Sequence, residues 1–309
     1  MQKLAIIIPA YKIDFFERTL ASLVRQTCRD FTVYIGDDCS PNDFESLIEN
    51  YKDKINIYYT RFETNLGGKD LVAQWERCVD LAQGEQWLWL FSDDDELEEN
   101  CVEQFYKTIS DNPKTSLVHF DVRVIDADGV YVKNKQFVKA DFAAHYTAKE
   151  YAKARLRYKI NSFVVEFIFR KDTFMENGRF QNFDMAWGSD DATWIKLSKD
   201  AGITTTKGAH VRWRLSDSNI TPRRNPETMI RKVYSVTNYL NFLDNQFHDK
   251  RLEKLYYWYF LHSLYNAMVE CQWSDICKVI KKYRIHHRDL MPMFGWHLIH
   301  KVINRNKIQ

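Results

Sequence analysis

In the first half of the chain, short apolar runs alternate with segments of helical spacing. The apolar runs cover residues 4–8, 31–36, 55–59, 86–91 and 116–125. Apolar residues with the period of an amphipathic helix lie between them, over residues 15–24, 42–51, 69–82 and 96–109. Strands that alternate with helices in this way predict βαβ units and a mostly parallel sheet. The expected fold is therefore an α/β fold with helices flanking the sheet.

The second half of the chain has a different pattern. Its spacing predicts two further strands and a helix between them, over residues 162–170, 209–215 and 191–200. Beyond Pro226 the pattern becomes helical and rich in aromatic residues. Because prolines interrupt regular elements, Pro222 and Pro226 mark a boundary. We expect an α/β domain over residues 1–222 and a helical, basic C-terminal region over residues 223–309.

The composition is that of a folded protein. Of the 309 residues, 45% are apolar, which is enough for a sizeable core. No run approaches the roughly 18 consecutive apolar residues of a membrane span. The apolar run before Pro9 and the polar helical pattern after it indicate a buried strand, not a signal peptide. The six cysteines are scattered without CxxC pairs, which predicts reduced thiols in a cytoplasmic protein.

Positive charge is concentrated at the C-terminus. Residues 278–309 hold eight Lys or Arg and one acid, so they carry +7, and because the whole chain carries +2, residues 1–277 carry −5. Such a tail predicts a polyanionic partner. It fits either a helix lying on an anionic membrane surface, which would make the protein peripheral on the inner face, or a packed helix with a solvated basic face. We do not expect the protein to bind nucleic acid, because the sequence contains no known nucleic-acid-binding motif.

Polar clusters follow three of the predicted strands: "PAYK" at 9–12, "DDCS" at 37–40 and "SDDD" at 92–95. In parallel sheets, ligands bind outside the carboxyl ends of the strands, so the three clusters are expected to face one crevice. Adjacent carboxylates repel each other, which indicates that a cation binds there. Carboxylate oxygens suit Mg²⁺ or Mn²⁺ bridging to a diphosphate. Alternatively, the acids only open the next helix, where the helix dipole favours them.

Together these segments resemble the family 2 glycosyltransferases with the GT-A fold. The resemblance is carried, in the family's order, by "IIIPAYK", "TLASLVRQTCRDFTVYIGDDCSPND", "TNLGGKDLVAQWERCVDLAQGEQWLWLFSDDD" and "WGSDDATWIKL". It implies a Rossmann-like GT-A domain with a nucleotide-binding half over about residues 1–125 and an acceptor half over about 126–222. It also implies inverting transfer from a nucleotide-sugar, above all a UDP-sugar, to a saccharide or lipid-linked acceptor in surface polysaccharide biosynthesis.

The resemblance also assigns residues to the donor, with the nucleobase held by Asp38. The nucleotide-sugar contacts that it implies are Pro9, Tyr11, Asp37, Asp38, Asn65, Gly67, Asp93, Asp94 and Arg214. The metal, Mn²⁺ or Mg²⁺, falls to Asp94 or Asp95. Ser92 stands where the family's motif begins with an acid, so the metal ligand among the aspartates stays open. Taken alone, "NLGG" at 65–68 is also an ordinary turn before a helix.

Inverting transfer needs a carboxylate that removes the proton of the acceptor hydroxyl. The family's acidic motif falls on Asp190 and Asp191, at the start of a predicted helix, and either could be the base. The alternative is structural, with Ser189 or Asp190 capping that helix. Arg214 lies in a segment that closes over the diphosphate in similar proteins. Its alternative is an edge strand with alternating exposed residues.

Two other classes of protein would share parts of this pattern. A sugar-nucleotide nucleotidyltransferase is expected to have a glycine-rich, basic loop after its first strand, and "PAYKIDFF" contains no glycine. A non-catalytic nucleotide-sugar-binding protein would keep the "DDCS" motif but would not need a base. The acid pair at 190–191 therefore favours an enzyme.

Overall fold

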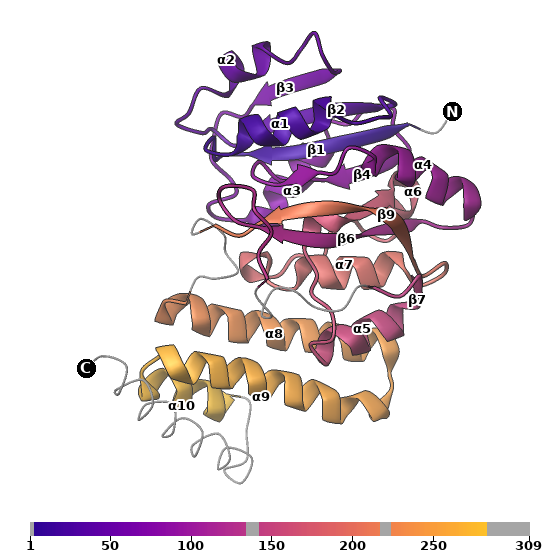
Figure 1. Ribbon diagram of the computed structural model, residues 1–309. Coiled ribbons are helices and arrows are strands. Elements are labelled where there is room, and N and C mark those ends of the chain that lie inside the picture. Colours follow the sequence, from indigo (N-terminus) through magenta and orange to yellow (C-terminus); the bar gives the residue numbers. More distant parts are fainter. Residues whose placement is uncertain (1–2, 134–141, 217–223, 283–309) are drawn as a thin grey trace. The chain divides into compact units, whose positions relative to one another are not determined.

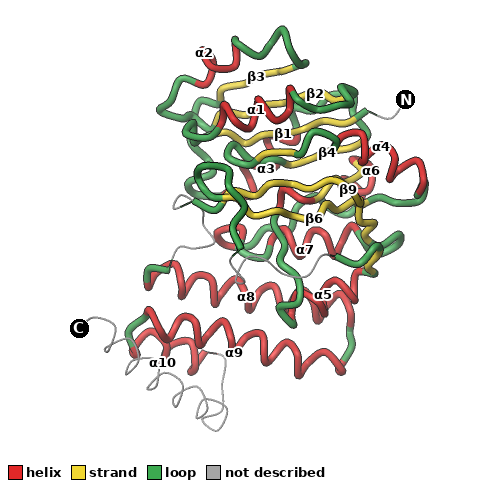
Figure 2. Tube along the Cα trace, viewed as in Figure 1, coloured by secondary structure: helices red, strands yellow, loops and turns green. Residues whose placement is uncertain are grey.

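Figure 1 shows the computed structural model of the chain, which describes residues 3–133, 142–216 and 224–282. The chain divides into two compact units, residues 1–218 and residues 219–309. The first unit is a twisted sheet with helices around it, and the second is helical over its described residues (Figure 2).

The N-terminal part of the sheet is parallel, as the alternating pattern predicts. Strands β3 (Ile57–Arg61), β2 (Phe31–Asp37), β1 (Leu4–Ala10) and β4 (Trp87–Leu90) lie side by side in that order. Their register pairs Ala10 with Asp37 and Ile7 with Leu90. The carboxyl ends of three strands, and the polar clusters that follow them, therefore meet at one edge of the sheet.

The rest of the sheet is mixed. Strand β8 (Phe167–Arg170) runs antiparallel between β4 and β6 (Leu117–Ile125), and β9 (Ile203–Arg214) runs parallel to β6. Two short strands, β5 (Glu96–Leu97) and β7 (His145–Tyr146), pair antiparallel with β9. The sequence pattern did not reveal that these strands run antiparallel to their neighbours. Side-chain alternation is the same in either direction, and the direction depends on the path of the connecting segments.

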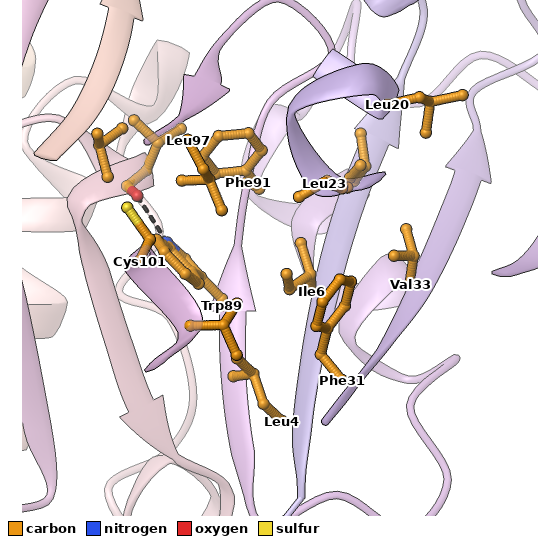
Figure 3. Close-up of a cluster of buried hydrophobic side chains, with 14 of the residues drawn as sticks. Leu4, Ile6, Leu20, Leu23, Phe31, Val33, Trp89, Phe91, Leu97 and Cys101 are labelled. Atoms are coloured by element: carbon orange, nitrogen blue, oxygen red, sulfur yellow. Dashed lines mark hydrogen bonds between the residues drawn. The ribbon is translucent and has the colours of Figure 1, made fainter. Parts of the chain in front are cut away.

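One predicted strand is shorter than expected. The apolar run at 162–170 begins with a 3₁₀ turn, Val164–Glu166, and only its end forms β8. Within the turn, the Phe163 amide donates to the Glu166 carboxylate at 3.0 Å. The Val165 carbonyl accepts a hydrogen bond of 2.7 Å from the Trp89 indole, so the turn is tied to β4 (Figure 3). An apolar run of this length is compatible with a strand or with a short helical turn.

Helices cover the sheet, and all but two, those over residues 148–156 and 171–176, lie close to positions predicted from the sequence. Those of the first unit are α1 (Phe16–Val24), α2 (Phe44–Glu49), α3 (Leu71–Val79), α4 (Cys101–Asp111), α5 (Ala148–Leu156), α6 (Lys171–Glu176) and α7 (Ser189–Leu197), with a 3₁₀ turn at Asp184–Ala186. Side-chain caps begin several of them. Asp43 accepts from the Ser46 amide in α2, Asp70 accepts from the Ala73 amide in α3, and Thr147 forms a capping box in α5.

The main core lies where helix α1 packs on the parallel strands. Figure 3 shows Leu20 and Leu23 of α1 facing Ile6 of β1 and Val33 of β2, and all four side chains are fully buried. Fully burying such a side chain stabilises a fold by about 1.5–3 kcal/mol. This packing holds β1 and β2 in place, and with them the loops that follow these strands.

The second unit contains the helices α8 (Pro226–Phe247), α9 (Glu253–Glu270) and α10 (Trp273–Lys282), with a 3₁₀ turn at Lys250–Leu252. Asn225 caps α8 by accepting from the Thr228 amide at 2.9 Å, and Pro226 occupies its first turn. The helical pattern predicted beyond Pro226 is therefore present. Over the described residues, no helix has both the length and the apolar character needed to cross a membrane.

Most of the basic tail lies outside the described residues. Of the segment 278–309, only residues 278–282 are described, as the end of α10, where Lys278 forms an ion pair of 2.9 Å with Asp275. Ile276 and Val279 on the same helix are buried. The predicted contact of residues 278–309 with an anionic membrane surface stays a prediction.

Candidate active site

The three polar clusters that follow β1, β2 and β4 are joined by hydrogen bonds. The Tyr11 amide of "PAYK" donates to the Asp93 carboxylate of "SDDD" at 2.8 Å. The Ser40 hydroxyl of "DDCS" donates to the Tyr11 carbonyl at 2.7 Å, and the Asp38 amide donates to the Ala10 carbonyl at 2.9 Å. The structure thus brings together the segments that were predicted to face one crevice.

Asp37 is fully buried and anchors its own loop. Its carboxylate accepts from the Tyr59 hydroxyl at 2.7 Å, the Arg61 guanidinium at 2.6 Å and the Ser40 amide at 2.7 Å. The next residue but one, Cys39, has φ of 54°, which is uncommon for a residue other than glycine. Asp37 therefore holds a strained turn, and its buried carboxylate provides little surface for a donor.

Asp38 organises the "NLGG" loop. Its two oxygens accept from the amides of Leu66 (2.6 Å) and Gly67 (2.8 Å), the Asn65 side chain (3.1 Å) and the Arg77 guanidinium (2.5 Å). A Cβ atom on Gly67 would lie 2.7 Å from the Asp38 carboxylate, so this approach requires glycine. A carboxylate has about four lone-pair positions, and all are used here. Asp38 therefore holds the loop in this structure, and its contact with the nucleobase stays a prediction.

Lys12 and two aspartates form a buried charge cluster. Asp93 accepts from the backbone amides of Tyr11 and Lys12, and the Lys12 ammonium forms an ion pair with Asp94 and lies 3.5 Å from Asp93. Burial raises the pKa of Asp93 to about 6, against the Lys12 charge, which lowers it. Burial lowers the pKa of Lys12, but the charges of Asp93 and Asp94 outweigh it and raise that pKa above its ordinary value.

Asp95 and Arg214 stabilise the loop at residues 92–95, called the aspartate loop below, through buried hydrogen bonds. The Asp95 carboxylate accepts from the Ser92 hydroxyl at 2.5 Å and from the Arg214 amide at 2.7 Å, and burial raises its pKa well above the ordinary value. The Arg214 guanidinium is completely buried and donates to the carbonyls of Asp94, Asp126 and Ala127 and to the Glu96 carboxylate.

One alternative is wrong: Arg214 is not an exposed edge residue, because it is fully buried on a strand that pairs with β5 and β6 and its guanidinium donates to the protein's own carbonyls. Its contact with a donor diphosphate stays a prediction. Asp95 is the less suitable metal ligand, because protein donors already bind both of its oxygens. Of the three aspartates, Asp94 is the one whose carboxylate pairs with a side chain that can move, that of Lys12.

The oxygens of this loop fit a divalent ion. Mg²⁺ and Mn²⁺ in nucleotide sites typically bind one or two carboxylates and complete their shell with phosphate and water. Asp94 offers such a carboxylate, and Asp93 lies beside it. Among the described residues no group of three or more His, Cys, Asp or Glu is arranged to hold a metal without other ligands.

The second acidic site lies at the start of α7. Gly188, with φ of 83°, occupies the N-cap position, and no side chain caps the helix. The capping alternative for Ser189 or Asp190 is therefore wrong; the Ser189 hydroxyl instead accepts from the Phe183 amide at 2.9 Å. The two residues Met185 and Ala186 just before this turn also have positive φ values, of 59° and 55°. Such strain is concentrated at functional sites.

Asp190 and Asp191 have opposite environments. Asp191 is buried and paired with the Arg155 guanidinium through both oxygens (2.8–3.1 Å), and it accepts from the Tyr151 hydroxyl at 2.5 Å. Asp190 is largely but not completely buried, and no ion pair reaches it within the described part of the chain. Burial, followed by the charge of Asp191, raises the pKa of Asp190 to about 7. A carboxyl with that pKa can accept a proton near neutral pH.

Three of these residues were not singled out from the sequence. Lys12 belongs to the quoted "PAYK" cluster but was given no role. Tyr151 and Arg155 lie on α5, about 40 positions along the sequence from Asp191, the acid that both of them bind. Tyr151 and Arg155 are four residues apart and so share one helix face, which is a signal that the sequence carries. The sequence does not indicate which partner that face meets.

Comparison with known families matches residues 5–177 to the family model described as "Glycosyl transferase family 2". Among curated proteins, "Poly(ribitol-phosphate) beta-N-acetylglucosaminyltransferase TarS" of Staphylococcus aureus is 31% identical over 134 residues. That match covers 42% of this chain but only 22% of TarS. "GalNAc(5)-diNAcBac-PP-undecaprenol beta-1,3-glucosyltransferase" of Campylobacter jejuni is 23% identical over 214 residues, or 68% of this chain and 64% of that protein.

Solved structures show the same fold. S. aureus TarS residues 1–349 in complex with UDP-GlcNAc has a TM-score of 0.61 at 16% identity and covers 99% of this chain and 92% of that one. GalNAc-T7 with UDP, GalNAc and Mn²⁺ has a TM-score of 0.55 at 15% identity and covers 77% of this chain and 48% of that one. The α/β GT-A fold and the helical C-terminal region predicted from the sequence are confirmed.

Proposed function

We propose that this chain, which belongs to glycosyl transferase family 2, transfers a sugar from a UDP-sugar to a saccharide or lipid-linked acceptor with inversion. One observation carries the proposal: of the two adjacent acids opening α7, one is held in an ion pair, whereas the other, Asp190, has a pKa raised to about 7 and forms no ion pair with any described residue. A non-catalytic binding protein has no need for this arrangement.

The donor is proposed to bind at the joined loops after β1, β2 and β4, in a nucleotide-binding half over about residues 1–125, with the acceptor half over about 126–222. Tyr11 supports this assignment, because its ring is 44% exposed directly beside the aspartate loop and a nucleobase can stack on it. Pro9, Asn65 and Gly67 are partly exposed around the same loops. UDP is favoured because TarS and GalNAc-T7 were solved with UDP or UDP-GlcNAc.

Asp190 is the proposed general base. Its carboxylate takes the proton of the acceptor hydroxyl while the oxygen of that hydroxyl bonds to the anomeric carbon and the bond to the UDP diphosphate breaks. Asp191 is fixed by Arg155 and Tyr151, so it positions the turn. Burial raises the pKa of Asp190 most, and the charge of Asp191 raises it further. The paired Asp191 is the weaker candidate for the base, because its lone pairs are already bound.

Asp94, with Asp93 beside it, would hold the divalent ion. When bound, Mn²⁺ or Mg²⁺ would neutralise the charge that develops on the leaving diphosphate. The acceptor is proposed from the relatives, one named for poly(ribitol-phosphate) and one for a polyprenol-linked saccharide. A role in surface polysaccharide biosynthesis at the cytoplasmic face of a membrane follows from that proposal.

The proposal is tested by incubating the protein with UDP-, GDP- and dTDP-sugars and Mn²⁺, with lipid-linked and polyol-phosphate acceptors, and detecting products by mass spectrometry. Asp190→Asn is compared with Asp200→Asn, which makes the same change at an exposed position after α7. We expect product from a UDP-sugar with wild type and Asp200→Asn only. Full activity of Asp190→Asn would reject the base assignment, and no UDP binding by calorimetry would reject the donor class.

A further inference from the structure

Lys12 is the movable cation of the aspartate loop. Its backbone amide donates to Asp93 at 2.7 Å, which fixes the start of the side chain, and its ammonium pairs with the Asp94 carboxylate. The Lys12 side chain remains 32% exposed, whereas the side chains of Asp93 and Asp94 are only 6% and 5% exposed. A lysine stem has four rotatable bonds, so the ammonium can leave without a change in the backbone.

The other cation near the loop cannot move in this way. The Arg214 guanidinium is buried and donates to three backbone carbonyls and Glu96. Asp95 is bound by Ser92 and the Arg214 amide. The Lys12 ammonium pairs with one oxygen, Oδ2, of the Asp94 carboxylate, so a divalent ion that binds this carboxylate meets the ammonium's positive charge and competes with it for the same anion.

We propose that Lys12 is a built-in competitor of the divalent ion: its ammonium pairs with Asp94 beside Asp93 when the donor is absent, and it is displaced when metal and donor diphosphate arrive together. This inference rests on the proposed donor site. It follows that the ion alone binds weakly, because it must displace a paired ammonium. The donor strengthens metal binding, because its phosphates supply further ligands and a new anionic partner for the released ammonium.

The test is titration with Mn²⁺ alone, followed by the electron paramagnetic resonance signal of the free ion. Lys12→Gln is compared with wild type and with Lys3→Gln, which removes the same charge at the opposite end of β1. We expect Lys12→Gln to bind Mn²⁺ about tenfold more tightly, because the ion no longer has to displace a paired ammonium or meet its positive charge. Lys3→Gln should match wild type. Lys12→Met, which keeps the aliphatic stem, replaces Lys12→Gln if that variant does not fold.

Thermal unfolding provides a second measurement that does not depend on activity. Without metal, Lys12→Gln leaves Asp93 and Asp94 unneutralised and should melt at a lower temperature than Lys3→Gln. Mn²⁺ should then raise its melting temperature more than it raises that of wild type. Equal Mn²⁺ affinity in all variants, or no Mn²⁺ binding by either Lys12 variant, would overturn the inference. If wild type still transfers sugar in that case, only the role of Lys12 fails; if it transfers none and binds no UDP, the proposed function fails.

Discussion

The strand-end aspartates and the acid pair on α7 use the same side chain in opposite ways. Asp37, Asp38 and Asp95 are buried and bound by protein donors, so they shape loops. At α7 one acid is bound in the same manner, but its neighbour Asp190 is left without an ion pair among the described residues. The comparison shows that most of these acids stabilise the fold, and it supports the proposal that Asp190, which has no ion pair among the described residues, is the base.

The difference has a physical origin. At the ends of parallel strands, many backbone amides point outward without a ladder partner, and carboxylates satisfy them. At the start of α7, the Arg155 and Tyr151 side chains converge on Asp191 and satisfy one carboxylate fully. The second carboxylate is then close to a fixed negative charge, which raises its pKa.

The largest effect is expected at the unpaired acid. Asp190→Asn should lower kcat by about 10²–10⁴-fold, the usual contribution of a general base, while UDP affinity stays unchanged. Steady-state kinetics and calorimetry measure the two quantities. If Asp190→Asn and the Asp200→Asn control have the same kcat, Asp190 has only a structural role. The acid pair on α7 would then not differ from the strand-end aspartates.

Next in size is the pair that holds Asp191. Arg155→Met should lower the free energy of unfolding by about 3–5 kcal/mol, because it leaves a buried carboxylate unpaired. The double variant Arg155→Met with Asp191→Asn should recover part of that loss, because the charge is removed as well. Urea denaturation of both variants gives the values. A single variant as stable as wild type would contradict a structural role for this ion pair.

A smaller effect is expected at the "NLGG" loop. Asp38→Ala leaves the Leu66 and Gly67 amides without their acceptor and should cost about 1–3 kcal/mol of stability, with a higher KM for the donor. Gly67→Ala should shift both quantities in the same direction, because its Cβ would lie 2.7 Å from the Asp38 carboxylate. If Asp38→Ala changes KM without any loss of stability, Asp38 binds the donor directly and the loop-holding interpretation is wrong.

The smallest effect is a displacement of the pH profile. Because the base must be ionised, kcat should rise with pH through an apparent pKa of about 7, the value for Asp190. Asp191→Asn removes the neighbouring negative charge, which favours ionised Asp190, so the rise should move to lower pH. Rates of wild type and Asp191→Asn between pH 5 and pH 9, roughly two units either side of that value, test this. A shift to higher pH would exclude Asp191 as the cause of the raised pKa.

The sequence by itself determined the parallel part of the sheet, the helical C-terminal region and the positions of both acid motifs. These features are local, because strand and helix periods and the residues that follow a strand are read within a few positions. The register of β1, β2 and β4 then brought the three polar clusters together, as predicted.

Only the tertiary structure decided which acids are neutralised. Asp95 meets the amide of Arg214, 119 positions away, and Asp191 meets Arg155, 36 positions away. The periodicity of one segment contains no information about which side chain of a distant segment will face it. Pairing sets the charge and pKa of each carboxylate. For this reason the sequence located two candidate bases and three candidate metal-loop acids, and the packing of α5, α7 and β9 gave these acids their different partners.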